Sequence, residues 1–267
     1  MGVLNVTPDS FSDGGKHFDR KRAIARALEI ESAGADLLDI GGESTRPGSQ
    51  PVSTGEEFSR VLPVLQGLHG KLQIPISIDT SKSEVAESAA AVGVEIVNDV
   101  TALRADPRLA AVARIHGMPL ILMHMRGEPL TMQKGPFARN ALNDVIDGLR
   151  RAVAVAHRAG VKRTQIVLDP GLGFGKRYEQ NFELMASLPR IAKLGFPLLV
   201  GPSRKSFVGR AAGVAPEESR VMGTAAAVVA SILQGAHIVR VHDVKEIAQA
   251  ARVADAILEN SGSTVRR

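Results

Sequence analysis

Residues 76–84 read ISIDTSKSE. Ile76–Ile78 is a short run rich in β-branched residues, as in buried parallel strands, and Asp79 closes it. Ser81 and Glu84 have the spacing in which a side-chain oxygen caps a helix while a carboxylate three residues later reaches back to the cap. A buried strand, a polar residue and a capped helix in direct succession predict one β/α unit.

The same unit recurs along the chain. Thr54 with Glu57 and Asp243 with Glu246 repeat the capping pattern. Eight hydrophobic runs alternate with helical segments, at residues 3–5, 37–40, 76–78, 96–98, 120–123, 166–168, 198–200 and 238–241. Strict alternation predicts an α/β fold with a parallel sheet, and eight strands are the number that closes a single-domain (β/α)8 TIM barrel over residues 1–267. A doubly wound open sheet has the same alternation and is the alternative.

Composition narrows the classes of function. The formal charge of +5 fits either a nucleic-acid partner or a site for an anionic substrate. Aromatic residues make up 3% and Trp is absent, so base-stacking platforms are few and we expect no nucleic-acid partner. Cysteine is absent, which excludes disulfides and thiolate catalysis. With no membrane-length apolar run and no signal-peptide pattern, we expect a cytoplasmic protein without a membrane partner.

Polar residues gather where the predicted strands end. In a parallel barrel the carboxyl ends of the strands lie on one face, which carries the active site. The closing residues are Asn5, Asp39, Asp79, Asn98, His124, Asp169, the Ser-Arg-Lys turn 203–205, and Arg240 with His242. Carboxylates and amides suit a planar heterocycle with a guanidine-like edge, whereas the cations and Asn5 suit phosphate and its Mg²⁺. The pattern predicts a site that reads a ring with one half and holds a leaving phosphate with the other.

Other motifs fit less well. Residues 171–176 are glycine-rich after a strand, but Pro170 and Arg177 break the P-loop pattern and Lys176 breaks the dinucleotide-binding pattern. His124 has no second metal ligand at helical spacing, so we interpret it as structural or substrate-shaping. The strand-to-helix loops 6–18 and 41–53 are long and rich in Gly, Pro and Ser, which is typical of functional loops.

Several long motifs resemble those of dihydropteroate synthases, and the resemblance covers essentially the whole chain. Residues 1–15, MGVLNVTPDSFSDGG, are similar to the family's first signature, and residues 39–48, DIGGESTRPG, to its second. Further matches follow in family order at residues 77–80, 98–100, 122–125, 168–176, 201–207 and 240–243. The resemblance implies a (β/α)8 enzyme that uses Mg²⁺, joins a dihydropterin diphosphate to 4-aminobenzoate and releases diphosphate.

The resemblance also implies roles for the matched residues. The pterin pocket would consist of Asp79, Asn98, Val100, Met123, Asp169, Phe174, Gly201 and Lys205. The diphosphate would be held by Asn5, Thr45, Arg46, Arg240 and His242, and Asn5 would also bind Mg²⁺. The 4-aminobenzoate pocket would form from Phe11, Thr45, Pro47, Ser203 and Lys205 when the two long loops close. The catalytic residues would be Asp79, Lys205, Arg240 and His242.

The mechanism implied by the resemblance is dissociative. The C–O bond to diphosphate breaks, the pterin methylene remains as a stabilised cation, and the aniline nitrogen attacks it. The family also implies a homodimer through outer helices and sensitivity to sulfonamides, because no insertion interrupts residues 201–207. The alternatives are a methyltetrahydrofolate-binding corrinoid methyltransferase, which would not need the diphosphate cations, and a non-catalytic pterin-binding protein, which should have lost part of the rim.

Overall fold

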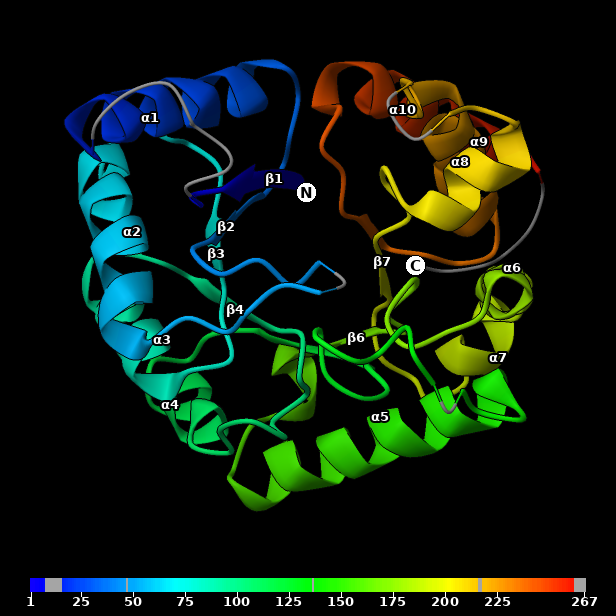
Figure 1. Ribbon diagram of the computed structural model, residues 1–267, viewed down its shortest axis with the longest axis horizontal. Coiled ribbons are helices and arrows are strands. Elements are labelled where there is room, and N and C mark those ends of the chain that lie inside the picture. The colour runs from blue at the N-terminus through cyan, green and yellow to red at the C-terminus, as the bar shows by residue number, and fades with distance from the viewer. Residues whose placement is uncertain (8–15, 47, 136, 216–217, 262–267) are drawn as a thin grey trace.

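Parallel strands surround a central axis, and helices lie outside them (Figure 1). The computed structural model describes residues 1–7, 16–46, 48–135, 137–215 and 218–261. Within these ranges the strands are β1 (Gly2–Asn5), β2 (Leu38–Gly41), β3 (Ile76–Asp79), β4 (Ile96–Asp99), β5 (Leu120–Met123), β6 (Ile166–Asp169), β7 (Leu199–Val200) and β8 (Ile238–Val239). Strands β1 to β6 form one sheet in chain order, and β7 pairs with β8. Each predicted strand is present, with small differences at the ends.

Two isolated bridges close the ring of strands. Leu168 in β6 pairs with Leu198 just before β7, and Gly2 in β1 pairs with Val241 just after β8. The Leu168 N–H donates to Pro197 O at 2.9 Å, and the Val241 N–H donates to Met1 O at 2.9 Å. Because the first and last strands are joined, the open-sheet alternative is wrong and the predicted barrel is confirmed.

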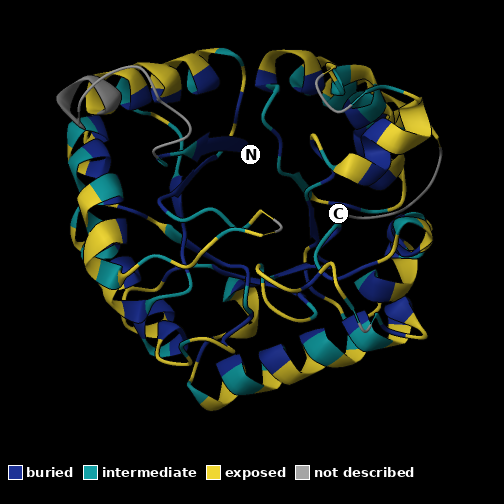
Figure 2. Cartoon of the chain, viewed as in Figure 1, coloured by how far each residue is buried: buried dark blue, intermediate teal, exposed yellow. Residues whose placement is uncertain are grey.

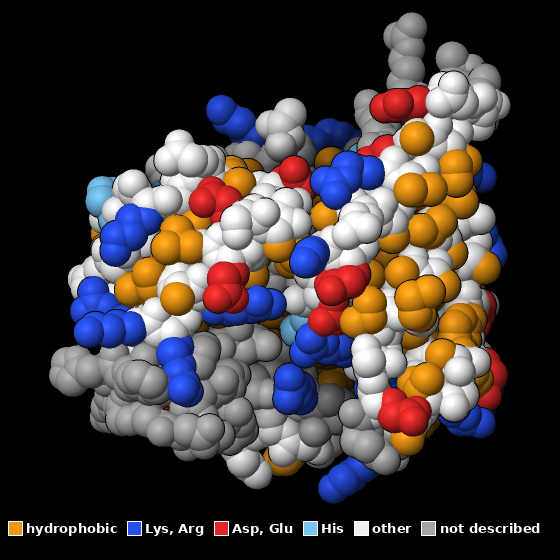
Figure 3. Space-filling view, turned by 90° about the horizontal axis from the view of Figure 1, so that it is seen from above, with side chains coloured by type: hydrophobic (Ala, Val, Ile, Leu, Met, Phe, Trp, Pro, Cys, Tyr) orange, Lys and Arg blue, Asp and Glu red, His pale blue; other side chains and the backbone are white. Residues whose placement is uncertain are grey.

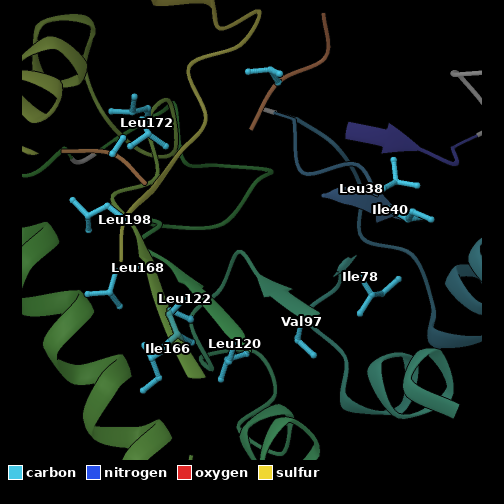
Figure 4. Close-up of a cluster of buried hydrophobic side chains, with 14 of the residues drawn as sticks. Leu38, Ile40, Ile78, Val97, Leu120, Leu122, Ile166, Leu168, Leu172 and Leu198 are labelled. Atoms are coloured by element: carbon cyan, nitrogen blue, oxygen red, sulfur yellow. The ribbon is translucent and has the colours of Figure 1, made fainter. Parts of the chain in front are cut away.

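The helices present their buried faces to the strands and their exposed faces to solvent (Figure 2). In the described ranges they are α1 (Lys16–Ser32), α2 (Thr54–Leu68), α3 (Ser83–Ala91), α4 (Leu109–Ile115), α5 (Ala141–Arg158), the 3₁₀ turn η2 (Arg163–Gln165), α6 (Tyr178–Ala186), α7 (Leu188–Ala192), α8 (Ser206–Ala212), α9 (Val221–Leu233) and α10 (Val244–Asn260). Strand residues such as Ile40, Ile78, Leu122 and Leu168 belong to the core between these two layers (Figure 4). None of the described helices is long and apolar enough to cross a membrane.

A second, smaller apolar cluster lies among the strands. Met1, Ile121 and Leu199 are buried together, with side chains from neighbouring strands packed around them. Layers of this kind fill the interior of a (β/α)8 barrel, so the barrel is a packed core and not a pore. The polar site is therefore confined to the mouth at the carboxyl ends of the strands.

Two of the three predicted helix caps are wrong in position. Helix α2 is capped by Ser53, whose side chain accepts the Glu56 N–H at 3.2 Å, and not by Thr54. Helix α3 has Lys82 at its N-cap without a side-chain capping bond, so Ser81 is not the cap. Asp243 does occupy the N-cap of α10, but its carboxylate accepts from Arg204 Nε at 3.0 Å and caps nothing. At α10 an ion pair between residues distant in sequence replaces the local capping bond.

Candidate active site

Arg240 joins the carboxylates of two strand ends. Its Nε donates to Asp39 Oδ2 at 2.6 Å, and its Nη2 donates to Asp79 Oδ2 at 2.8 Å. Asn98 Nδ2 donates to the same Asp39 oxygen at 3.0 Å. Asp39, Asp79 and Asn98 lie in β2, β3 and β4, and Arg240 follows β8, so one network crosses the barrel mouth.

Burial and the neighbouring charges both shift the pKa values in this network. Burial raises the pKa of Asp79, and the guanidinium of Arg240 opposes that rise. Burial alone would lower the pKa of Arg240, but Asp39 and Asp79 raise it above its ordinary value, so Arg240 remains a cation. Two buried carboxylates share this one cation, and a ligand that gains positive charge is therefore favoured here.

Asp169 and Lys205 form the second charged part of the mouth. Asp169 Oδ1 accepts the Gly171 N–H at 2.7 Å, and burial raises the pKa of Asp169 to about 6. Burial, followed by the nearby Arg240, lowers the pKa of Lys205 to about 8. A Cβ at Gly171, whose φ is +66°, would lie 1.9 Å from His124 O, so only glycine allows this turn.

Apolar residues line the same mouth. Val100, Met123, Met125 and Met132 form a buried cluster, and Phe174 packs against it. Lys205 Nζ lies 4.0 Å from the centroid of the Phe174 ring. A Cβ at Gly201 would stand 3.8 Å from Arg240 Cβ, so a side chain there would approach the network. The structure thus gathers the predicted pterin-side residues around the barrel mouth.

His242 is held by Ser203. The His242 backbone N–H donates to Ser203 Oγ at 3.1 Å, and the same Oγ lies 3.1 Å from His242 Nδ1. Both contacts hold the imidazole ring of His242 against the Ser203 hydroxyl. Burial, followed by Arg240 and Arg204, lowers the pKa of His242 to about 3. In the ligand-free chain His242 is therefore a neutral imidazole, which offers an anion an N–H donor and not a positive charge.

The loop after β2 carries two of the predicted diphosphate residues. Thr45 is half-buried and Arg46 is exposed, and in the described part of the chain neither forms a hydrogen bond or ion pair with Arg240 or His242. The Gly48 N–H donates to Pro129 O at 3.0 Å, so this loop is hydrogen-bonded to the loop after β5. Phe11 and Pro47, predicted for 4-aminobenzoate, lie outside the described residues.

Asn5, the predicted metal ligand, ends β1 and is half-buried. Among the described residues no three His, Asp or Glu side chains are grouped as a metal site. Mg²⁺ commonly keeps several waters and binds substrate phosphates together with one or two protein oxygens. The single amide oxygen of Asn5 fits a Mg²⁺ that arrives with a diphosphate, and does not fit a metal held by the protein alone.

Sequence reasoning missed an ion-pair cluster behind the second signature. Lys82 pairs with Glu43 of the loop after β2 and, at 2.5 Å, with the fully buried Glu57 of α2. Arg60 Nη1 of α2 also donates to Gly42 O at 2.6 Å. The only local signal was that Glu43 lies inside the signature motif. The role of Asp39 as partner of both Arg240 and Asn98 was missed as well.

The sequence was compared with protein-family models and with known proteins. A model described as pterin binding enzyme matches residues 1–242. A dihydropteroate synthase of Synechocystis is 48% identical over 257 residues, which are 96% of this chain and 89% of the relative. The chain belongs to the pterin-binding enzyme family and, within it, to the dihydropteroate synthases.

Solved structures of the family superpose on nearly the whole chain. The enzyme of Clostridium difficile, solved in the presence of pteroic acid, has a TM-score of 0.90 at 45% identity and covers 96% of this chain and 95% of its own. That of Yersinia pestis with a sulfonamide drug has a TM-score of 0.90 at 43% identity, with coverage of 97% and 94%. The structure of the Xanthomonas albilineans enzyme with 4-aminobenzoic acid has a TM-score of 0.89 at 42% identity. The match covers 97% of this chain and 92% of that one. The predicted family and enzyme class are confirmed, and the corrinoid methyltransferase and the non-catalytic binder are set aside.

Proposed function

We propose that the chain condenses (7,8-dihydropterin-6-yl)methyl diphosphate with 4-aminobenzoate to give 7,8-dihydropteroate and diphosphate. The observation that carries this proposal is the Asp39–Arg240–Asp79 network at the barrel mouth. Asn98, which is proposed to contact the pterin ring, donates to Asp39 of this network. Arg240, the cation of the network, precedes His242 by two residues. Ring-reading and anion-binding groups are thus parts of one connected site.

Asp169 supplies the acceptor for the pterin edge. Its ionised carboxylate would accept the 2-amino and N3–H groups, Lys205 would donate to the ring carbonyl, and Asn98 would bond the other edge. Val100, Met123 and Phe174 would flank the faces of the ring. Buried, pre-positioned polar groups discriminate strongly because a wrong ring leaves them unpaired.

Arg240 and His242 would serve the leaving group. As the C–O bond breaks, its electron pair stays with the diphosphate, whose added charge the guanidinium and the ring N–H of His242 can stabilise. The carboxylates of Asp39 and Asp79 would favour the positive charge left on the pterin methylene. The aniline nitrogen then forms the new C–N bond and loses a proton. Bound Mg²⁺, with Asn5 as a ligand, would neutralise charge on the diphosphate.

Thr45, Ser203 and Lys205 would form the described part of the 4-aminobenzoate pocket. This assignment rests on their position in the family's motifs and on the placement of Ser203 beside His242. Phe11 and Pro47 are proposed for the same pocket, and Arg46 for the diphosphate, from the motifs alone. The cytoplasmic location and the lack of a nucleic-acid partner stay predictions.

A product assay tests the proposed activity. Purified chain is incubated with the dihydropterin diphosphate, 4-aminobenzoate and Mg²⁺, and 7,8-dihydropteroate is measured by mass spectrometry. Product should form in the complete mixture and be missing when either substrate is omitted or when EDTA is added. Undiminished product with EDTA would contradict the role of Mg²⁺, and the lack of product in the complete mixture would contradict the activity.

We also propose that two copies pair through α9 and α10. Seven large hydrophobic side chains are exposed in the described chain, and four of them lie on these two helices: Met222, Leu233, Val253 and Ile257. Hydrophobic side chains gather on part of the face seen in Figure 3, over the side where Figure 1 places these helices. An exposed apolar patch of this kind is typical of a self-complementary interface.

Light scattering tests the dimer. The wild-type chain should have the mass of two copies, and Val253→Lys with Ile257→Lys should give a monomer that retains its circular dichroism spectrum. Ile115→Lys, an equally exposed position on α4, is the control and should remain dimeric. A wild-type monomer at assay concentrations would contradict the pairing.

A further inference from the structure

A cavity of about 520 Å³ lies beside the barrel mouth, in the helix layer. It is lined by the end of β5 and the loop that follows, by the loop after β4, and by α5. Of the residues proposed to contact pterin, only Met123 also lines this cavity. Its volume falls within the range of small-molecule sites. Apart from Met123, its lining has no part in the pterin or diphosphate assignments.

The floor of the cavity is apolar and adaptable. Met125 and Met132 are buried and belong to the same cluster as Met123. Leu103 from the loop after β4 and Ala152 from α5 complete the floor. Thioether side chains are flexible and polarisable and adjust to flat or irregular apolar ligands. The floor therefore suits an aromatic body better than a hydrated ion.

The rim of the cavity is cationic. Arg104, Arg126 and Arg151 line it, against one carboxylate, that of Asp144. Arg126 Nη1 donates to Asp144 Oδ1 at 3.1 Å, so this carboxylate already has a partner. The surplus of guanidinium groups favours a ligand with negative charge, and their planar forks match a carboxylate.

His124 adds a neutral donor to the same rim. The Nζ of buried Lys176 lies 3.2 Å from His124 Nδ1 and also donates to His124 O and Phe174 O. Burial, followed by Lys176 and the surrounding arginines, lowers the pKa of His124 well below its ordinary value, so the ring stays neutral. Nε2 lies 3.5 Å from Asp144 Oδ2. The sequence interpretation of His124 as substrate-shaping is thus extended to a second ligand.

We propose that this cavity binds an aromatic carboxylate at a site separate from the reaction centre. The carboxylate would lie against the arginine rim, and the ring would rest on the methionine floor. The site needs no loop closure, because its lining is already assembled around the cavity.

The loop after β5, which lines the cavity, is tied to the reaction centre. Gly127, Thr131 and Met132 belong to the loop whose Pro129 O accepts the Gly48 N–H at 3.0 Å. Gln133 Nε2 of the same loop donates to Gly173 O at 2.7 Å. An occupant that shifts this loop would also shift the loops after β2 and β6, so its binding should be coupled to that of 4-aminobenzoate.

Methionine methyl signals locate the ligand directly. The chain has seven methionines, and Met125 and Met132 line the cavity whereas Met118, Met185 and Met222 do not. The holo chain, labelled with [methyl-¹³C]methionine and saturated with 7,8-dihydropteroate, is titrated with 2-naphthoate. The Met125 and Met132 signals should move in a saturable way while the other three stay in place. Stationary Met125 and Met132 signals overturn the proposal.

Neighbouring arginines on α5 provide matched variants. Arg151 lines the cavity, whereas Arg150 lies 3.5 Å from Asp147 on the exposed side of the helix. Arg151→Ala should weaken 2-naphthoate binding about tenfold and Arg150→Ala should not, since one charge-assisted contact is lost only in the first. Arg151→Gln serves if the alanine variant is unstable. Equal effects of both positions, or equal affinity for neutral 2-naphthamide or inorganic phosphate, overturn the assignment.

The coupling has its own readout in steady-state kinetics. Saturating 2-naphthoate should change the KM for 4-aminobenzoate in the wild-type chain and much less in Arg151→Ala, whose KM without naphthoate is unchanged. An identical KM change in both chains would place the naphthoate in the substrate pocket and contradict the separate site.

Discussion

At the scale of single residues, Asp169 lies where folding and ligand recognition have opposite requirements. Its pKa is raised from 3.8 to about 6 by burial. Because the folded value is the higher one, protonation of Asp169 stabilises the ligand-free chain below about pH 4, and that contribution is lost as the pH rises through 6. The pterin edge needs the ionised carboxylate, so ligand affinity should change in the other direction.

Affinity for a pterin without diphosphate should therefore weaken by up to about tenfold for each pH unit below 6. Asp169→Asn should remove this pH dependence and cost roughly 2 to 4 kcal/mol of binding, because a donor then faces the ligand's N–H groups. Isothermal calorimetry between pH 5 and 8 measures both effects, with the exposed Asp147→Asn as control. Near-normal affinity in Asp169→Asn would contradict the assignment.

Removal of Arg240 should affect the stability of the fold. Arg240→Ala would leave Asp39 and Asp79 buried without their cation, which should lower the free energy of unfolding by about 3 kcal/mol. Asp39→Asn combined with Arg240→Ala should recover part of that loss, since one carboxylate is then neutral. Urea denaturation of the two variants measures it. If the single and the double variant lose the same free energy of unfolding, the ion pairs of Arg240 contribute little to stability.

At the scale of elements, the ion pairs of Lys82 connect the loop after β2 to α2 and α3. Burial disfavours the charged form of Lys82, but Glu43 and Glu57 raise its pKa above the ordinary value. Glu57 is fully buried, and one of its oxygens has no hydrogen-bond partner among the described residues. Lys82 is therefore a positioning residue for the base of the loop that carries Thr45 and Arg46.

Lys82→Met should raise the KM for 4-aminobenzoate by about tenfold and leave pterin affinity within twofold, because the loop base is released while the mouth is intact. Lys82→Arg should restore much of the KM. Lys71→Met, an exposed position after α2, should have no effect. Adding Glu57→Gln to Lys82→Met should restore stability without restoring the KM, and recovery of both would point to a purely structural role.

Strands and rim residues could be predicted from the sequence because their signals are local. A short β-branched run and the polar residue that ends it, such as Ile76–Ile78 with Asp79, can be recognised from a few consecutive residues. The contacts that make the site work are not local: Arg240 bonds Asp39 from 201 residues away. For the same reason Asp243 lies at the predicted N-cap of α10 but does not cap it, since its carboxylate accepts from Arg204 across 39 residues.

At the scale of the whole molecule, ligand binding should be ordered. The pterin-side residues are already assembled, whereas the proposed 4-aminobenzoate pocket also needs residues of the two long loops. Sulfamethoxazole should therefore bind weakly or not at all to the bare chain and tightly once a pterin and diphosphate are present. Calorimetric titration with and without these ligands tests it. Tight binding to the bare chain would contradict ordered assembly.

Both halves of the rim are proposed to serve a single transfer reaction. The most direct test measures diphosphate release and 7,8-dihydropteroate formation in the same reaction mixture. The two products should appear in equal amounts at every time point, and sulfamethoxazole should suppress both in competition with 4-aminobenzoate. Diphosphate release in excess of dihydropteroate, or release that 4-aminobenzoate does not stimulate, would contradict it.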